Sequence, residues 1–172
     1  MCGIVGIFSE THVASSIYES LLMLQHRGQD AAGMVVCDLN GRLHSRKSMG
    51  YVRDAFQQRH MNKLEGHYGI GHVRYPTAGG SGKDFAQPMY VNSPYGISLA
   101  HNGNLTNSKA LARELFHAEM RHLNTDSDSE VLLNIFAHEL AKQRAILPSS
   151  KHFFQAVKKT HSRCHGAYAV VA

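Results

Sequence analysis

The chain has 172 residues, 43% of them hydrophobic, and a formal net charge of +5. This length and apolar content fit one domain that can bury its own core. No apolar run approaches the roughly 20 residues that a membrane-spanning helix needs, and the first residues lack the regions of a signal peptide. Lys and Arg are scattered without interleaved aromatics. We therefore expect no nucleic-acid partner, no membrane association and a cytoplasmic location.

The cysteines and histidines do not predict a metal site. Cys2, Cys37 and Cys164 lie far apart, which is not typical of a disulfide framework, a zinc site or an iron–sulfur cluster. Among 13 histidines, only the segment 161–165 has a loose ligand-like spacing, and the second ligand pair of a zinc site is missing. We interpret this segment as the polar end of a helix and expect no metal or cofactor in this chain.

Residues 2–75 predict four strands and two helices. Apolar and β-branched runs predict strands at 2–8, 31–38, 42–47 and 68–75, the first of them buried. Asn40-Gly41 predicts a hairpin between the second and third strands. A helix is expected from a Thr11 cap to about Gln25, with Val13, Ile17, Leu21 and Leu24 on one side, ended by Gly28. A second helix is expected, on weaker periodicity, at 54–65.

Residues 76–172 predict a loop, three strands and three helices. The loop at 76–88 contains Gly79, Gly80 and Gly82 and should be mobile. Further strands are expected at 89–91, 96–101 and 166–172. Helices are expected at 108–121, presenting Leu111, Leu115 and Phe116, from a capping box at 127–130, and at 152–162. Clustered strands and helices favour a layered α+β fold over a doubly wound parallel sheet.

Cys2 is the first residue that could carry chemistry. Initiator methionine is generally removed before a small second residue, so the mature chain would present a thiol and an α-amine on one residue. Such an amine has a reference pKa of about 7.7–8.0 and can exchange protons with the thiol. A terminal amine that serves its own side-chain nucleophile is a known catalytic arrangement. Taken alone, Cys2 is equally typical of a small apolar residue that opens a buried strand.

Five sequence blocks occur in the order expected of one family. They are MCGIVGI at 1–7, QHRGQDAAG at 25–33, GHVRYPTAG at 71–79, AHNGNLTN at 100–107 and TDSDSE at 125–130. The chain resembles the class II glutamine amidotransferases, which use an N-terminal cysteine nucleophile. Gln29, Tyr75-Pro76-Thr77 and the segment 87–107 are most similar to the amidophosphoribosyltransferase branch. The resemblance covers essentially the whole chain.

The resemblance implies a role for each of seven residues. Cys2 would be the nucleophile, and the Asn102 amide and the Gly103 N–H would form the oxyanion hole, although Asn-Gly is also typical of a turn. Arg74 would hold the α-carboxylate of glutamine, with Thr77 in the same pocket. Asp128 would bind the α-ammonium; Asp126 competes with it on spacing alone. Arg27 would support the closed glutamine loop.

The resemblance also implies a fold and a reaction. The fold would be the four-layer α/β/β/α sandwich of N-terminal-nucleophile hydrolases. Residues 1–172 would form a glutaminase domain, truncated at its C-terminus, that hydrolyses glutamine to glutamate and ammonia. The parent protein is expected to continue into a phosphoribosyltransferase domain, absent here, which would use Mg²⁺ and convert phosphoribosyl pyrophosphate to phosphoribosylamine in purine biosynthesis. The full-length protein is expected to be a homo-oligomer.

Two other interpretations remain open. One is a stand-alone class II amidotransferase that serves a different acceptor. The other is a non-catalytic domain in which Met1 is retained and the α-amine of Cys2 is blocked.

Overall fold

The computed structural model describes residues 2–75 and 82–172. The chain divides into two compact units, the first comprising Met1–Pro88, Leu99–Asn102 and Ala169–Ala172, and the second comprising Met89–Ser98 and Gly103–Tyr168. Its strands form a four-stranded sheet of order β1-β4-β2-β3 and a three-stranded sheet of order β5-β6-β7. No helix in the described ranges has the length and apolar character that crossing a bilayer requires.

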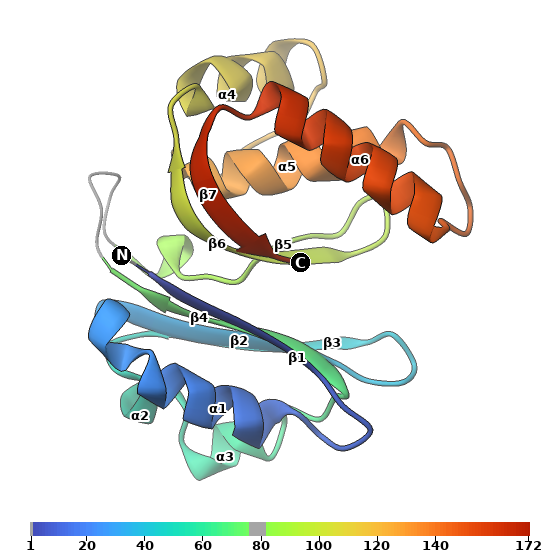
Figure 1. The fold of residues 1–172 in the computed structure, drawn as a ribbon. Coiled ribbons are helices and arrows are strands. Elements are labelled where there is room, and N and C mark those ends of the chain that lie inside the picture. Colours follow the sequence, from blue (N-terminus) through green and yellow to red (C-terminus); the bar gives the residue numbers. More distant parts are fainter. Residues whose placement is uncertain (1, 76–81) are drawn as a thin grey trace. The chain divides into compact units, whose positions relative to one another are not determined.

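The four-stranded sheet is antiparallel at every pairing. Its strands are β1 (Gly3–Phe8), β2 (Ala31–Cys37), β3 (Leu43–Met49) and β4 (Tyr68–Arg74). Helix α1 (Ala14–Met23) and the short helices α2 (Val52–Ala55) and α3 (Gln58–Met61) cover one face of this sheet (Figure 1). The apolar side chains of α1 and the sheet form the main core between them. All four predicted strands are therefore confirmed, as is the hairpin at Asn40-Gly41.

Strand β1 is less buried than predicted. It lies at the edge of the sheet and pairs only with β4. Gly3 is buried, but Phe8 at the other end is 73% exposed and contacts the Tyr68 ring at a tilt of 46°, 5.0 Å between ring centroids. An edge strand has a neighbour on one side only, so its apolar residues can line the core without being fully enclosed.

Helix α1 packs closely on β4. As predicted, Val13, Ile17 and Leu21 are buried. A Cβ atom at Gly69 would lie 2.6 Å from Ile17 Cδ1, and one at Gly71 would lie 2.6 Å from Ile17 Cγ2. The absence of side chains at these two positions of β4 is what allows the helix to approach the sheet.

The two residues predicted to bound this helix, Thr11 and Gly28, do not do so. Thr11 does not cap it: the helix begins after Val13 without a side-chain cap, and the Thr11 hydroxyl contacts Ser9 Oγ at 3.2 Å. The helix ends at Met23, and the 3-10 turn η1 (Gln25–Arg27) separates it from Gly28, whose backbone is extended. Tertiary packing has overridden the local cap signals here.

The single helix predicted at 54–65 is also wrong, because the segment forms α2 and α3 with a break between them. Phe56 leaves the helical conformation, is 4% exposed and packs edge-on against Tyr18, 6.3 Å between ring centroids. Gln57 is extended and caps α3 through a box with His60. Burial of the Phe56 ring accounts for the break.

We expect Phe56→Ala to destabilise the fold by about 3 kcal/mol, because it removes a buried aromatic ring from the core under α1. Phe154→Ala is the matched control: Phe154 is 73% exposed on α6, and its loss should change stability by less than about 0.5 kcal/mol. Urea unfolding of both variants measures the difference. Equal losses would contradict the assignment of Phe56 to the core.

The second unit contains the helices that follow β6 in the chain. The three-stranded sheet consists of β5 (Met89–Val91), β6 (Ile97–Leu105) and β7 (Gly166–Val171). The helices are α4 (Ser108–His117), α5 (Asp128–Ala141) and α6 (Ser150–Arg163). Leu105 at the end of β6 packs with Leu111 and Leu115 of α4 and with apolar residues of α5. The predicted strands and helices of this half are confirmed, with shifted ends.

Three local predictions in this half need correction. Helix α4 ends at His117, short of the expected residue 121, and Phe116 is 60% exposed and does not line its buried face. Ser127 caps α5, accepting a hydrogen bond from the Ser129 N–H. Glu130 does not complete the predicted box; its carboxylate accepts hydrogen bonds from the N–H groups of Asn124 and Thr125 at 2.9 and 2.7 Å. It thereby fixes the loop that leads into the helix.

A charge cluster ties the three helices of the second unit together. Arg163, the last residue of α6, contacts Glu119 at 2.7 Å, Glu139 at 2.5 Å and Glu114 at 3.1 Å. His138 lies 3.2 Å from the other oxygen of Glu119. The side chains of Glu119 and Glu139 are nearly inaccessible to solvent, so Arg163 supplies the charge that their burial requires.

Candidate active site

Cys2 lies where β1 begins, beside the end of β4. Gly3 pairs with Val73, so the sulfur lies at the point where the chain leaves β4. The Tyr75 N–H donates to Cys2 Sγ at 3.5 Å, and Sγ lies 4.0 Å from the Tyr75 carbonyl oxygen. The Cys2 side chain is partly exposed. The sulfur of the predicted nucleophile thus contacts the backbone of Tyr75, the residue after β4, and is partly accessible.

Arg27 also contacts Cys2, through the Cys2 backbone. Its Nε donates to the Cys2 carbonyl oxygen at 3.0 Å, and its side chain is partly buried. The turn η1 that carries Arg27 packs tightly on the end of β4, since a Cβ at Gly28 would lie 2.5 Å from the Arg74 carbonyl carbon. Gly28 is therefore needed for close approach. Its predicted role, ending the first helix, is taken by the preceding turn.

Arg74 is buried at the end of β4 and pairs with a carboxylate. Its Nη1 donates to Asp30 Oδ2 at 2.6 Å, and the Asp30 N–H donates to the Arg74 carbonyl oxygen at 3.0 Å. The Phe85 ring lies under the guanidinium, 5.3 Å from its carbon to the ring centroid. Asp30 and Phe85 orient the predicted carboxylate-binding group. Neither was predicted, because their approach depends on strand register and on the turn η2 (Lys83–Phe85).

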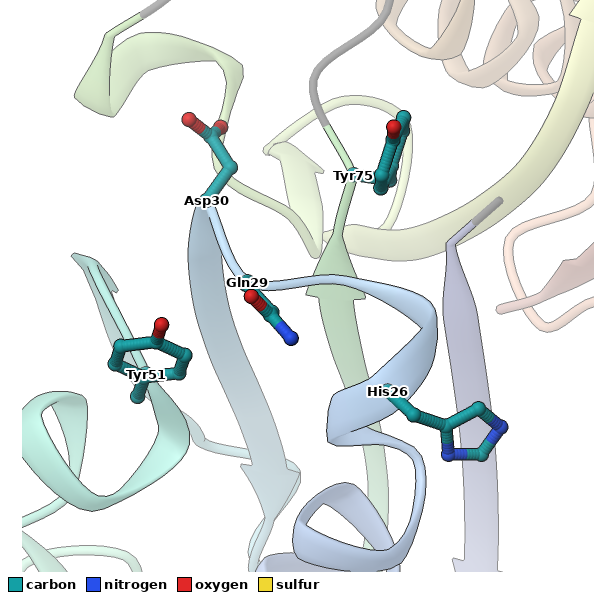
Figure 2. Close-up of a pocket in the computed structure, with 5 residues that line it drawn as sticks. All are labelled: His26, Gln29, Asp30, Tyr51 and Tyr75. Atoms are coloured by element: carbon teal, nitrogen blue, oxygen red, sulfur yellow. The ribbon is translucent and has the colours of Figure 1, made fainter.

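A pocket of about 410 Å³ opens beside this pair in the first unit. Figure 2 shows Asp30 and Tyr75 on adjacent strand ends, with Gln29 below them and Tyr51 to one side; His26 completes the lining. Every lining residue can form hydrogen bonds. The pocket is therefore suited to a polar ligand.

The predicted oxyanion residues lie inside a strand. Asn102 and Gly103 belong to β6, which continues to Leu105, so the alternative of an Asn-Gly turn is wrong. Gly103 has φ 157°, and a Cβ there would lie 2.5 Å from Tyr168 Cα in the neighbouring strand β7. Position 103 therefore requires glycine. Asn102 is partly buried and belongs to the first unit, whereas Gly103 belongs to the second.

Asp128 is the first residue of α5 in the second unit. Its Oδ2 accepts a hydrogen bond from the Leu105 N–H at 3.0 Å, and the residue is partly buried, whereas Asp126 is exposed. A carboxylate at a helix N-terminus interacts favourably with the helix dipole. The structure thus holds Asp128 beside Leu105, the last residue of β6, which follows Gly103 by two positions. Thr77, Gly79 and Gly80 lie outside the described residues.

The other two cysteines differ from Cys2 in environment. Burial raises the pKa of Cys164 to about 11. Burial, followed by the negative charge of Asp38, raises the pKa of Cys37. Both are therefore protonated near neutral pH and are poor nucleophiles. In residues 2–75 and 82–172 no three His, Cys, Asp or Glu side chains are placed to hold a metal ion, and His161 contacts the Tyr168 hydroxyl at 2.7 Å.

Comparison with known proteins identifies the class of protein. A family model described as a glutamine amidotransferase domain matches residues 80–172. The chain belongs to this glutamine amidotransferase family.

The relatives define a narrower group. The chain is 60% identical to the amidophosphoribosyltransferase of Pseudomonas aeruginosa and 56% identical to that of Escherichia coli, in each case over the whole chain and 34% of the relative. It thus spans about a third of the length of the curated relatives it matches.

Two solved structures share the fold. One, titled as the allosteric regulatory enzyme of purine biosynthesis, is 34% identical with a TM-score of 0.81. The other, a glutamine phosphoribosylpyrophosphate amidotransferase from B. subtilis complexed with ADP and GMP, is 32% identical with a TM-score of 0.80. Each match covers 99% of this chain and 34% of the other chain. These matches confirm the predicted α+β fold of the N-terminal-nucleophile hydrolase type.

Proposed function

We propose that this chain hydrolyses the side-chain amide of glutamine to glutamate and ammonia, with Cys2 as the nucleophile. The observation that carries the proposal is the position of Cys2 Sγ at the end of β4, 3.5 Å from the Tyr75 nitrogen. Tyr75 directly follows the buried Arg74 in the sequence. Membership of the glutamine amidotransferase family supports the choice of substrate.

The reaction proceeds in two halves. The thiolate of Cys2 attacks the amide carbon, and the carbonyl electrons move onto oxygen. The C–N bond then breaks, and ammonia leaves with a proton carried by the α-amine of Cys2, which Met1 removal exposes. Water attacks the resulting γ-glutamyl thioester, the C–S bond breaks, and glutamate is released with regeneration of the thiol.

Four groups stabilise the substrate and its transition state in this proposal. Asn102 and Gly103 donate hydrogen bonds to the developing oxyanion, and loss of one such donor typically costs about a hundredfold to a thousandfold in rate. Arg74 binds the α-carboxylate, for which a guanidinium offers two parallel N–H groups, and Asp128 binds the α-ammonium. Arg27 supports Cys2 through its carbonyl, and Thr77 is proposed to contribute to the carboxylate pocket.

In the longer protein the ammonia is proposed to displace pyrophosphate from phosphoribosyl pyrophosphate, which gives phosphoribosylamine. The names of the relatives, which are about three times as long as this chain, support that step. A Mg²⁺-dependent phosphoribosyltransferase domain, a homo-oligomeric assembly and a cytoplasmic location belong to the same proposal. The 172-residue chain alone is expected to hydrolyse glutamine weakly and to form no phosphoribosylamine.

A glutamine analogue with an electrophilic diazoketone carbon tests the nucleophile directly. We expect one adduct per chain, and peptide mapping should place it on the N-terminal cysteine. Intact mass before labelling distinguishes the non-catalytic alternative, in which Met1 is still attached. An adduct on Cys37, or none at all in a chain that has lost Met1, would contradict the proposal.

Arg74→Ala is expected to raise the KM for glutamine by about a hundredfold, because it removes a buried charge-assisted contact worth roughly 3 kcal/mol. The kcat should fall much less if the carboxylate is held equally in the ground and transition states. Arg59→Ala, at an exposed position of α3, is the control and should leave both constants unchanged. A loss in kcat with unchanged KM would refute the assigned role.

A further inference from the structure

Two buried side chains bind the backbone of His101, the residue before Asn102. The His101 N–H donates to Gln87 Oε1 at 2.7 Å, and the His101 carbonyl oxygen accepts a hydrogen bond from His72 Nε2 at 3.2 Å. His72 and Gln87 are both buried, and all these residues belong to the first unit. Both backbone groups of residue 101 are therefore bound by side chains.

The strand arrangement explains why side chains are needed here. In a strand, the N–H and C=O of one residue point to the same side. Strand β5 borders β6 on one side but begins only at Met89, and Pro88 before it has no N–H to donate. Ahead of the first residue of β5, Gln87 and His72 provide the acceptor and the donor that a strand beginning earlier would provide.

Both side chains are held in place. A Cβ at Gly33 would overlap the carbonyl oxygen of Gln87, so β2 lies directly against the Gln87 backbone. His72 is completely buried, and burial, more than the nearby His101 and Arg74, lowers its pKa to about 3. The ring is therefore neutral near physiological pH. Because a carbonyl can only accept, its single proton is on Nε2.

We infer that His72 and Gln87 are positioning residues for Asn102. By fixing the backbone of His101, they fix the position at which the backbone of Asn102 begins. This determines the direction from which the side-chain amide of Asn102 can donate to an oxyanion. This inference rests on the proposed function, since it assumes that Asn102 is an oxyanion donor. It adds two residues, neither of which needs to touch glutamine.

A pair of substitutions at position 72 tests the inference. His72→Met keeps the bulk but has no donor, whereas His72→Gln carries an N–H near the position of Nε2. We expect His72→Met to lower kcat for glutamine hydrolysis by about tenfold to a hundredfold with little change in KM, since a displaced catalytic group can cost that much. His72→Gln should restore most of the rate. Gln87→Met should behave like His72→Met.

Ile70→Val is the control for packing. Ile70 is buried on the same strand two residues earlier, and its loss of one methylene group should lower the unfolding temperature without changing kcat. Unfolding temperatures of all variants separate a folding defect from a catalytic one. If His72→Met and His72→Gln lose rate equally, or if the loss follows unfolding temperature as in Ile70→Val, the inference is overturned.

A double-mutant cycle with Asn102→Ala separates this inference from the proposed function. If both hold, Asn102→Ala lowers kcat strongly, and adding His72→Met costs little more, because the group it positions is gone. If the two losses multiply, the proposed function survives and the positioning role is refuted. If Asn102→Ala leaves kcat unchanged, the oxyanion assignment fails, and the positioning inference fails with it.

Discussion

Cys2→Ala is expected to abolish glutamine hydrolysis, with a loss in kcat of about a thousandfold or more, because the step that forms the thioester has no other nucleophile. The fold should be unaffected, since Cys2 is partly exposed and precedes the first residue of β1. Ammonia release measured at saturating glutamine gives the rate. Labelling by the diazoketone analogue should disappear in the same variant.

Cys37→Ala is the matched control for this loss. Cys37 is also partly exposed, but burial and the negative charge of Asp38 raise its pKa, so its thiol is protonated near neutral pH. Its removal should leave both activity and labelling intact. Residual ammonia release in Cys2→Ala, lost on further replacement of Cys37, would show that the wrong sulfur had been assigned.

Arg163→Met is expected to destabilise the chain by about 3 kcal/mol, because it leaves two nearly inaccessible carboxylates, those of Glu119 and Glu139, without their shared cation. Lys142→Met is the control. Lys142 also contacts Glu139, at 3.1 Å, but its own side chain is half exposed, so its removal should cost less than about 1 kcal/mol. Thermal or urea unfolding at neutral pH compares the two; equal losses would contradict the central place of Arg163.

The same cluster predicts how this difference depends on pH. Burial opposes ionisation of Glu139, but hydrogen bonds from Lys142 and Arg163 outweigh it and lower its pKa below the ordinary value of 4.5. A carboxyl group whose pKa is lowered by folding adds stability above its ordinary pKa and loses it as the pH falls through the lowered value. The advantage of the unmodified chain over Arg163→Met should therefore shrink below about pH 4.5. A constant difference between pH 7 and pH 3 would contradict this linkage.

Much of the fold could be predicted from local patterns. Apolar and β-branched runs and the Asn40-Gly41 turn predicted the strands of the first sheet, and the spacing of Val13, Ile17 and Leu21 predicted the buried side of α1. The predictions were wrong where contacts with residues far away in the sequence determine the local conformation. Phe56 breaks a helical pattern because its ring enters the core, and Asn102-Gly103 continues a strand because β7 lies alongside it.

The residues of the candidate site also fall into two groups, those that sequence motifs indicated and those that depend on distant contacts. The resemblance of five sequence blocks to the glutamine amidotransferases implied roles for Cys2, Arg74 and Asp128, and these roles stay predictions. Asp30 and His72 could not be found in this way, since their roles depend on contacts across 44 and 29 positions of the chain. Such contacts depend on the register between strands, which no single segment encodes.

The packing of α1 on β4 restricts which side chain can occupy position 17. The two hollows left by Gly69 and Gly71 are filled by different branches of one side chain, Cδ1 of Ile17 in the first and Cγ2 in the second. Valine has no atom for the first hollow, and leucine lacks the β-branch that fills the second. Among aliphatic residues isoleucine alone has both atoms, so position 17 discriminates between leucine and isoleucine, which are isomers of similar hydrophobicity. A larger residue at Gly69 or Gly71 would need a smaller side chain at position 17.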